Sequence, residues 1–307
     1  MSIVERTAEF LGKIDRPNSM SPAPGELDPI ERAVSEITAR SELNSVREPE
    51  GKGVAFEVKA AARPARPTSS TSRIIRVDRN QLRRQAMITP DGERTPNAES
   101  LRRIKRLILA KAAKPRAGAP ANLVMVASAL EGEGKTFCAI NLAISIASEV
   151  DRSVLLVDGD VANPSIPQAL GLKTEQGLMD VLSRKVDLAE VLLNIDLGKF
   201  TLLPAGTAHQ HAPELLASDA MRVLLQDMAE RYHDRIIIFD SPPLLRASEA
   251  GILASLMGQI VLVVEAGKTS EVALKAALSH IESSNVTGLV LNKAVGPGSE
   301  FQYGGYG

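Results

Sequence analysis

A short glycine-rich stretch, Gly132-Glu-Gly134-Lys135-Thr136, has the residue types and spacing that most clearly predict chemistry in this sequence. Glycines allow the backbone to curl so that successive N–H groups point at phosphate oxygens. The lysine can then reach the β- and γ-phosphates of a nucleotide, and the threonine hydroxyl can bind Mg²⁺. An apolar run precedes the stretch and a helical pattern follows it, which is the setting that a phosphate-binding loop (P-loop) requires. We therefore expect ATP and Mg²⁺ as cofactors, with the nucleotide bound by Glu131, Gly132, Glu133, Gly134, Lys135, Thr136 and Phe137.

Three aspartates follow apolar runs that predict buried strands. Asp158 and Asp160 come after the run 154–157, and Asp240 comes after 236–239. An acid at the end of a strand beside a P-loop holds Mg²⁺ through its water shell, and a second acid can accept a proton from an attacking hydroxyl. The alternative is that these acids only cap helices or form turns. We expect the metal to be held by Thr136, Asp158 and Asp240. We expect the catalytic residues to be Lys135, Asp158, Asp160 and Asp240.

The elements that must position these groups follow one pattern from about residue 98 onward. Apolar runs alternate with stretches of 3.6-residue periodicity. Continuous apolar strands separated by helices predict an α/β fold, with a mostly parallel sheet that has helices on both faces. Ligands of such sheets bind at the C-terminal ends of the strands. The apolar runs are 123–127, 154–157, 200–203, 236–239, 260–264 and 288–291, and the periodic stretches include 98–112, 135–149, 219–230 and 270–283.

Composition narrows the functional class. The single cysteine, Cys138, excludes a disulfide framework and any multi-cysteine metal site, and we expect it to be a buried small apolar residue. Aromatic residues make up only 3% of the 307 residues and tryptophan is absent, which argues against an aromatic platform for nucleic acid. The longest largely apolar stretch, 251–264, is too short to span a bilayer. We expect a cytoplasmic protein with no transmembrane segment of its own.

The first 80 residues differ in composition from the rest. Residues 1–14 have the pattern of a short amphipathic helix, for which we expect a docking role. Residues 15–80 are interrupted by prolines and predict a flexible linker, so that the N-terminal region is largely disordered. The overlapping stretch 57–116 holds 16 Lys and Arg against five Asp and Glu, an excess of 11 positive charges. Such a block favours either an anionic neighbour or a solvated linker.

The motifs together resemble those of the deviant-Walker P-loop ATPases and, within them, the bacterial protein-tyrosine autokinases (BY-kinases) of exopolysaccharide export. The resemblance covers about residues 80–307 and the first helix. It implies a P-loop tyrosine kinase domain over 81–300 and a tyrosine-containing tail over 301–307. Residues 85–106 and the opening residues look like the subgroup linked to exosortase-type polysaccharide loci. The matching segments are the P-loop, Leu155–Pro164, Ile236–Pro243, 203–206, 214–218, 263–269 and 288–293.

This resemblance implies substrates and partners. Tyr303 and Tyr306 would be phosphorylated on neighbouring subunits of a homo-oligomer. A separate inner-membrane chain-length-determinant protein would activate the chain and hold it at the periphery of the inner membrane. Asn292, at a predicted strand end, either hydrogen-bonds adenine or only ends the strand. The implied subunit-contact motif consists of Glu99, Arg102 and Lys105.

The sequence departs from the resembled family at four positions. Ala129 replaces the first glycine of the P-loop, and Glu131 stands where proline is frequent. Ala162 and Glu249 stand where arginine and aspartate are frequent.

Two alternative functions stay open. One alternative is a positioning ATPase of the MinD/ParA kind, which the basic stretch would suit, although Leu130 occupies the place of the signature lysine of that group. A second alternative is a nucleotide-sensing scaffold without catalysis.

Overall fold

The computed structural model describes residues 74–92, 96–113, 120–281 and 286–294. The predicted docking helix at 1–14, most of the predicted linker, and the predicted target tyrosines Tyr303 and Tyr306 lie outside these residues. The sequence predicts that the linker reaches residue 80, whereas the structure has a strand, β1 (Ile74–Ile75), and the start of a helix, α3 (Arg79–Arg84), before that point. The folded part begins earlier because Ile75 and Val77 pack against the hydrophobic core.

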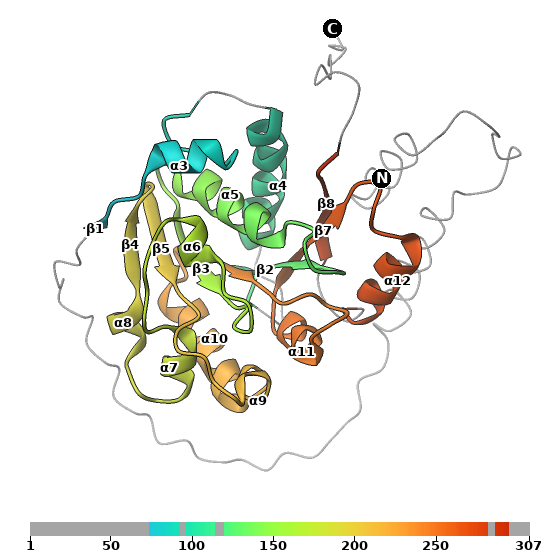
Figure 1. Ribbon diagram of the computed structural model, residues 1–307. Helices are drawn as coiled ribbons and strands as arrows, with labels where there is room; N and C mark the ends of the chain where they lie inside the picture. The colour runs from blue at the N-terminus through green and yellow to red at the C-terminus, as the bar shows by residue number, and fades with distance from the viewer. Residues whose placement is uncertain (1–73, 93–95, 114–119, 282–285, 295–307) are drawn as a thin grey trace, which may run out of the picture. The chain divides into compact units, whose positions relative to one another are not determined.

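One sheet organises the described residues, with eight strands in the order β1-β4-β5-β3-β6-β2-β7-β8 (Figure 1). Neighbouring strands are parallel except in the β4–β5 hairpin, which is antiparallel. The prediction of a mostly parallel sheet is therefore confirmed, and all six predicted apolar runs are strands. The strands after β1 are β2 (Leu123–Ser128), β3 (Ser153–Asp158), β4 (Leu193–Asp196), β5 (Lys199–Leu203), β6 (Arg235–Asp240), β7 (Gln259–Glu265) and β8 (Val286–Asn292).

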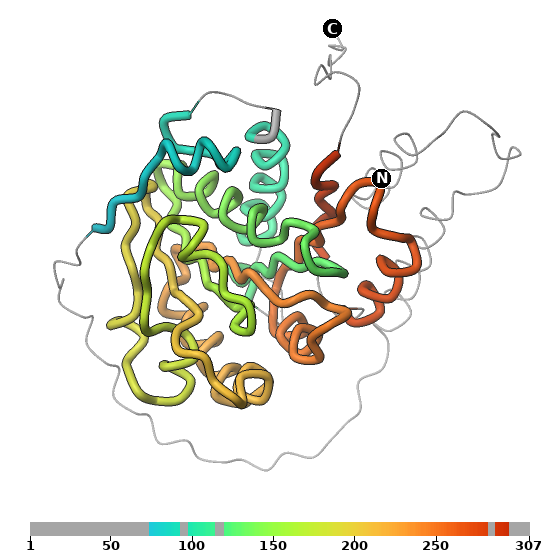
Figure 2. Tube along the Cα trace, in the orientation of Figure 1, coloured from blue at the N-terminus to red at the C-terminus, as the bar shows by residue number. Residues whose placement is uncertain are grey.

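Helices cover both faces of the sheet, as Figures 1 and 2 show. One hydrophobic cluster joins the sheet to α3, α4 (Pro96–Ala112), α5 (Lys135–Ala147) and α6 (Ile166–Ala169). A second cluster joins the opposite face to the helices that follow. The predicted periodic stretches correspond to α4, α5, α10 and α12. The helices of the second face are α7 (Leu178–Leu182), α8 (Leu188–Val191), α9 (Ala212–Leu216), α10 (Asp219–Arg231), α11 (Ser248–Ser255) and α12 (Glu271–Ser279).

The central strands and α5 are the most deeply buried elements, and they hold both ends of the predicted P-loop. Every residue of β2 is buried, with Val124 and Val126 in one cluster and Leu123 and Met125 in the other. This alternation is why β2 is a continuous apolar run, since both of its faces are covered. Each such side chain stabilises the fold by about 1.5–3 kcal/mol through burial. Cys138 in α5 is buried, as expected, and burial raises its pKa to about 12.

In the part of the chain that the structure describes, none of the helices is long and apolar enough to cross a membrane.

Candidate active site

The P-loop connects the end of β2 to the start of α5, and two of its glycines have left-handed backbone angles. The φ angle is +77° at Gly132 and +93° at Gly134, a region that side chains with a Cβ rarely adopt. A Cβ on Gly134 would also lie 2.1 Å from Asn292 Nδ2. The left-handed conformation therefore favours glycine at position 134, and any larger residue would also displace the Asn292 side chain.

The departure at Ala129 is accommodated by the local backbone. Ala129 is not among the residues with a positive φ angle, and its methyl group is buried in the core. Its carbonyl oxygen accepts a hydrogen bond from the Leu245 N–H at 3.2 Å. No left-handed conformation is needed at this position, so an alanine fits where many P-loops have glycine.

Backbone N–H groups of the P-loop are available to a ligand. Among the described residues, no acceptor lies within hydrogen-bonding range of the N–H groups of Gly132, Glu133 and Gly134. Helix α5 begins directly after Gly134 without a side-chain cap, so its first N–H groups and its positive dipole end face the same region. This combination is a binding site for an anion such as a phosphate.

Tertiary structure brings the predicted catalytic and metal residues together at this loop. Asp158 and Asp240 end the adjacent strands β3 and β6 and are paired in register. Thr136 Oγ1 donates to Asp240 Oδ2 at 2.6 Å, and Lys135 Nζ lies 2.9 Å from Asp160 Oδ2. The lysine, the threonine and all three acids therefore form one cluster, and a role of the acids as simple turn residues does not explain this convergence.

Gly159 allows Asp158, the last residue of β3, and Asp160, just after it, to lie beside the end of β6. A Cβ on Gly159 would lie 2.7 Å from the Asp240 carbonyl oxygen, closer than real Cβ contacts occur. The Gly159 N–H donates to this same oxygen at 2.9 Å. The spacing Asp158-Gly-Asp160 thus has a structural cause, because only glycine lets the chain turn so closely against Asp240.

The three carboxylates are buried and incompletely hydrogen-bonded. Asp158 Oδ1, Asp160 Oδ1 and Asp240 Oδ1 have no hydrogen-bond partner among the described residues. Burial raises the pKa of Asp158 to about 7, against the lowering effect of a hydrogen bond from the Ile166 N–H at 3.1 Å. Burial likewise raises the pKa of Asp240 to about 7, although the Thr136 hydroxyl and Lys135 favour its ionised form. The three acids of the described residues do not converge as a three-carboxylate metal site. Mg²⁺ usually takes only one or two carboxylates beside substrate phosphates, and the Thr136 hydroxyl with an unsatisfied acid such as Asp240 fits that requirement.

The remaining nucleotide-binding candidates lie in different environments. Glu131 is exposed and pairs with Arg246 at 2.9 Å, whereas the Glu133 side chain is buried and directed to the protein. Phe137 is half-buried against the core behind the P-loop. Asn292 Nδ2 donates to the Glu133 carbonyl at 2.8 Å, which the alternatives considered for this residue did not include.

Sequence reasoning missed three polar residues near this site. Ser165 Oγ donates to Thr136 Oγ1 at 3.2 Å, Thr269 contacts Glu133, and Lys293 Nζ donates to the Gly132 carbonyl at 2.6 Å. Thr269 and Lys293 belong to segments that match the resembled family, but no motif type marks them as P-loop contacts. Only their place after β7 and β8 brings them near.

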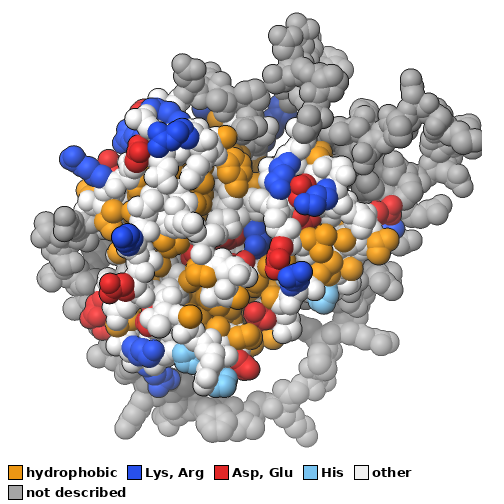
Figure 3. All heavy atoms as spheres, in the orientation of Figure 1, with side chains coloured by type: hydrophobic (Ala, Val, Ile, Leu, Met, Phe, Trp, Pro, Cys, Tyr) orange, Lys and Arg blue, Asp and Glu red, His pale blue; other side chains and the backbone are white. Residues whose placement is uncertain are grey.

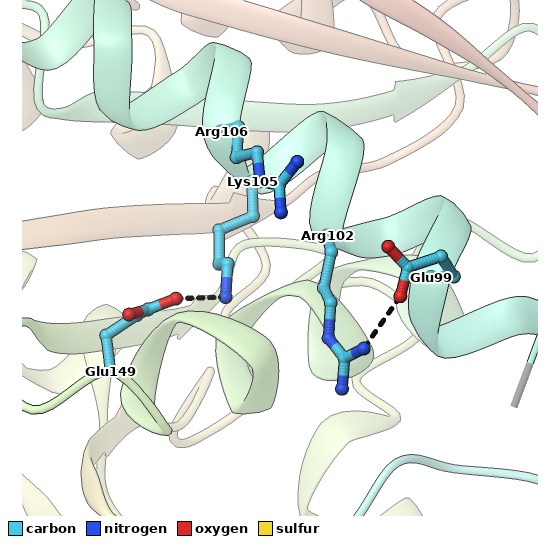
Figure 4. Close-up of a pocket in the computed structure, with 5 residues that line it drawn as sticks. All are labelled: Glu99, Arg102, Lys105, Arg106 and Glu149. Carbon is cyan, nitrogen blue, oxygen red and sulfur yellow. Dashed lines mark hydrogen bonds and ion pairs between the residues drawn. The ribbon is translucent and has the colours of Figure 1, made fainter. Parts of the chain in front are cut away.

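The predicted subunit-contact residues line a separate pocket of about 280 Å³ between α4 and the end of α5 (Figure 4). Arg102 pairs with Glu99 on its own helix at 2.7 Å. Lys105 is buried, donates to the Ser145 carbonyl at 3.3 Å and forms an ion pair with Glu149. Lys105 is thus already engaged within the chain, while Arg102 and Glu99 remain accessible to a neighbour.

Positive charge in the described part of the basic stretch is largely paired. Figure 3 shows Lys and Arg side chains gathered over α3. Arg83 pairs with Asp91 at 2.9 Å, and Arg84 lies 3.6 Å from Asp78. Such exposed pairs contribute little stability, but they reduce the net charge of this surface. An anionic neighbour or a solvated segment stays the prediction for the stretch 57–116.

Comparison of the sequence with known proteins gives a consistent result. The sequence profile of the family described as AAA domain matches residues 121–288. Tyrosine-protein kinase YwqD of Bacillus subtilis (strain 168) is 34% identical over 185 residues, which are 59% of this chain and 77% of YwqD. Tyrosine-protein kinase Etk of Escherichia coli (strain K12) is 29% identical over 176 residues, which are 57% of this chain and 24% of Etk. The chain therefore spans about a quarter of the length of Etk.

Solved structures share the fold. The kinase domain of VpsO is 26% identical with a TM-score of 0.53, and the match covers 64% of this chain and 98% of that domain. The kinase domain of Escherichia coli tyrosine kinase ETK is 24% identical with a TM-score of 0.57, and the match covers 73% of this chain and 98% of that domain. The predicted P-loop fold is confirmed by these likenesses.

Proposed function

The chain belongs to the AAA domain family and, within it, to the bacterial tyrosine-protein kinases, and from this premise we propose that it is an ATP-dependent autokinase that phosphorylates neighbouring copies of itself. The observation that carries the proposal is the convergence of Lys135 and three buried acids beside unpaired P-loop N–H groups. In this proposal the P-loop N–H groups bind the phosphates of a nucleoside triphosphate, and the acids face the incoming hydroxyl.

The chain's own groups divide the work of phosphoryl transfer. Bound Mg²⁺·ATP supplies the phosphoryl group and the positive charge that neutralises its oxygens. The P-loop N–H groups and Lys135 stabilise the charge that develops on the transferred group, and Asp160 orients Lys135 through their 2.9 Å ion pair. Thr136 and Asp240 would hold the cation. Asp158 would also face the cation and would orient the tyrosine hydroxyl and accept its proton, which its pKa of about 7 permits near neutral pH.

The tyrosines that we propose as substrates are those of the C-terminal tail. The chain has three tyrosines, and only Tyr303 and Tyr306 lie among the last residues, flanked by glycines. The third, Tyr232, ends helix α10, and the Arg235 guanidinium lies 4.7 Å from its ring centroid. A glycine-flanked tail can extend into another active site more readily than a residue that is packed in the fold.

Phosphorylation of a neighbour requires an oligomer, and α4 offers the contact. Glu99 and Arg102 lie on an accessible part of α4 and carry opposite charges, so they can exchange their mutual ion pair for pairs with a second copy. The ion pair of Lys105 with Glu149 would hold this part of α4 in place. We propose that subunits associate through α4 and that each tail reaches the next active site.

We further propose a place for the protein at the cytoplasmic side of the inner membrane, in exopolysaccharide polymerisation and export. The support is the naming of its relatives, which include a putative tyrosine-protein kinase in the cps region of Klebsiella pneumoniae, 29% identical over 57% of this chain. An inner-membrane chain-length-determinant protein would activate the kinase. Membership in the exosortase-associated subgroup stays a prediction.

The decisive experiment incubates the purified full chain with Mg²⁺ and γ-labelled ATP and detects phosphotyrosine. We expect label on Tyr303 and Tyr306, reduced stepwise in Tyr303→Phe and Tyr306→Phe and absent when both are replaced. Tyr232→Phe is the matched control and should label as the unchanged protein does. Lys135→Met should abolish label in every background.

Transfer between subunits is tested by mixing. Lys135→Met protein that retains its tyrosines should become labelled when mixed with active protein that lacks Tyr303 and Tyr306. ATP hydrolysis without phosphotyrosine would contradict the proposal and favour a positioning ATPase. Tight ATP binding without hydrolysis or phosphotyrosine would favour a nucleotide-sensing scaffold.

A further inference from the structure

Two residues at the end of β8 hold the outer side of the P-loop. Asn292 Nδ2 donates to the Glu133 carbonyl at 2.8 Å, and Lys293 Nζ donates to the Gly132 carbonyl at 2.6 Å. These contacts join residues 159 and 161 positions apart in the sequence. Sheet order makes them possible, because β8 lies beside β7, and β7 lies beside β2, whose end begins the P-loop.

The two contacts determine the direction of the N–H groups that follow the Gly132 and Glu133 carbonyls. In a trans peptide, the carbonyl of one residue and the N–H of the next point in opposite directions. Because the Gly132 and Glu133 carbonyls point at Lys293 and Asn292, the N–H groups of Glu133 and Gly134 must point away from β8, toward the inside of the loop. These two N–H groups have no acceptor among the described residues. The side chains after β8 therefore orient the donors that a phosphate would meet.

The backbone at Lys293 is strained in the way that functional positions often are. Its φ angle is +57°, a left-handed conformation that residues with a Cβ rarely adopt, because the Cβ comes too close to the following carbonyl oxygen. Such strain persists where surrounding contacts impose it. Here the carbonyl of the preceding Asn292 accepts from the Ala266 N–H at 2.9 Å, and Lys293 Nζ also lies 3.3 Å from Glu265 Oε1. These contacts keep the lysine directed at the P-loop.

The end of β7 holds the same loop from a second point. The Glu133 carboxylate is only 2% exposed, and its Oε2 accepts from the Leu130 N–H at 2.6 Å. Its Oε1 accepts from the Thr269 hydroxyl, which in turn accepts from the Glu265 N–H at 3.1 Å. Backbone and side chain of Glu133 are thus both fixed from strands that contribute nothing to the acid cluster.

We infer that Asn292 and Lys293 are positioning residues that preset the P-loop for phosphate, by holding the Gly132 and Glu133 carbonyls outward so that the next N–H groups face the ligand. The inference rests on the proposed function only in taking the ligand to be the phosphates of a nucleotide. It assigns Asn292 to the loop rather than to the adenine base. It also explains why position 134 has no room for a Cβ, since Asn292 fills that space.

The test measures affinity for Mg²⁺·ADP and for Mg²⁺·tripolyphosphate, which has no adenine, together with thermal stability. Lys293→Met keeps the length of the side chain but removes the donor, and Asn292→Ala removes the other donor. Loss of one such contact should weaken both ligands by the same factor, about tenfold, without lowering the melting temperature of the ligand-free protein by more than a few degrees. Lys293→Arg, which retains a donor, should restore most of the affinity.

Lys268→Ala is the matched control, because Lys268 shares Glu265 with Lys293 at 3.2 Å but makes no contact with the P-loop. It should leave both affinities within about twofold. If Asn292→Ala weakens ADP but not tripolyphosphate, Asn292 contacts the base and the inference is overturned for that residue. If neither variant changes either affinity, it is overturned for both.

A measurement on the ligand-free protein separates this inference from the proposed function. Hydrogen exchange of the Leu130 amide, which is protected by its hydrogen bond to Glu133 Oε2, should be faster in Lys293→Met and Asn292→Ala than in the unchanged protein, and unaltered in Lys268→Ala. Unaltered exchange in all variants would overturn the inference even where kinase activity is present. If exchange is faster in these two variants but the unchanged protein binds neither ADP nor tripolyphosphate, the loop contacts are supported and the proposed function is overturned.

Discussion

Two buried acidic sites near the C-terminal ends of the strands differ in how completely their carboxylate oxygens are hydrogen-bonded. Asp180 in α7 is 2% exposed, and its Oδ2 accepts hydrogen bonds from the Gly177 N–H at 3.0 Å and the Thr207 N–H at 2.9 Å. Burial by itself would raise its pKa, but these N–H groups outweigh that effect and the pKa is lowered. Asp158 and Asp240 are fully buried, each with one unpaired oxygen, and their pKa is raised to about 7.

The difference separates a carboxylate that the protein itself hydrogen-bonds from two carboxylates that it leaves incompletely hydrogen-bonded. At Asp180 the protein supplies the hydrogen bonds that water would otherwise make, so the charge stabilises the loop between β5 and α9. At Asp158 and Asp240 it leaves oxygens unsatisfied, which destabilises the ligand-free fold. A fold retains such oxygens where a ligand completes them, and a metal beside a phosphate would do so.

Replacing Asp240 should give the largest effect and should separate activity from stability. We expect Asp240→Asn to lower the rate of tyrosine phosphorylation by about 10²–10³-fold, since a carboxylate that would hold the cation beside the transferred phosphate is lost. The same change removes an unsatisfied charge and should raise the free energy of unfolding of the metal-free protein by about 1 kcal/mol. Steady-state kinetics measures the phosphorylation rate, and chemical denaturation measures the free energy of unfolding. Asp234→Asn, an exposed acid just before β6, is the control. A variant that is both active and less stable would contradict the comparison.

Replacing Asp180 should have the opposite outcome. We expect Asp180→Ala to lower the free energy of unfolding by about 3 kcal/mol, because the buried Gly177 N–H and the partly buried Thr207 N–H lose their acceptor, and a buried group left unpaired costs about 1–3 kcal/mol. The rate of phosphorylation per folded molecule should stay unchanged. Asp180→Asn keeps an oxygen acceptor and should lose less stability. An unchanged denaturation midpoint in Asp180→Ala would remove the structural role assigned here.

Ligand binding should stabilise the protein only when the functional acids are intact. At a hundredfold excess of Mg²⁺·ADP over its Kd, the free energy of unfolding of the unchanged protein should rise by about 2.7 kcal/mol. At the same ligand concentration Asp158→Asn should gain clearly less, whereas Asp180→Asn should gain the full amount. Calorimetric unfolding with and without ligand measures the gain. An equal increase in the free energy of unfolding in all three proteins would show that Asp158 does not contribute to binding Mg²⁺·ADP.

The smallest expected effect is the contribution of Asp180 to the pH dependence of the free energy of unfolding. Since the pKa of Asp180 is lower in the folded protein than in the unfolded chain, the unfolded chain takes up the proton first as pH falls. The stability that this carboxylate contributes is present above the unfolded pKa of about 3.9 and is lost as pH falls through the folded pKa. Denaturation curves between pH 6 and about pH 3 should therefore fall less steeply for Asp180→Asn than for the unchanged protein. Parallel curves would show that this hydrogen-bonded site adds no acid sensitivity.

Local patterns in the sequence were sufficient for the long elements and for the residue types of the active site. Strands such as β2 are continuous apolar runs because both faces are covered, and helices such as α10 show their period because one side is exposed. Gly134 and Lys135 are recognisable because phosphate binding needs those residues in adjacent positions. The short strands β1 and β4 gave no such signal, since a strand of two or four residues is too short for a recognisable apolar run.

Contacts between distant segments were decided by the tertiary structure alone. Asp158 and Asp240 lie side by side because β3 and β6 pair in register across more than eighty residues of chain. Lys105 has the spacing of a surface motif, yet it is buried because α4 packs on α5 beside Glu149. Lys293 reaches the P-loop through sheet order and a left-handed backbone. Sequence spacing describes neighbours along the chain, whereas burial and the order of the strands determine which charges meet.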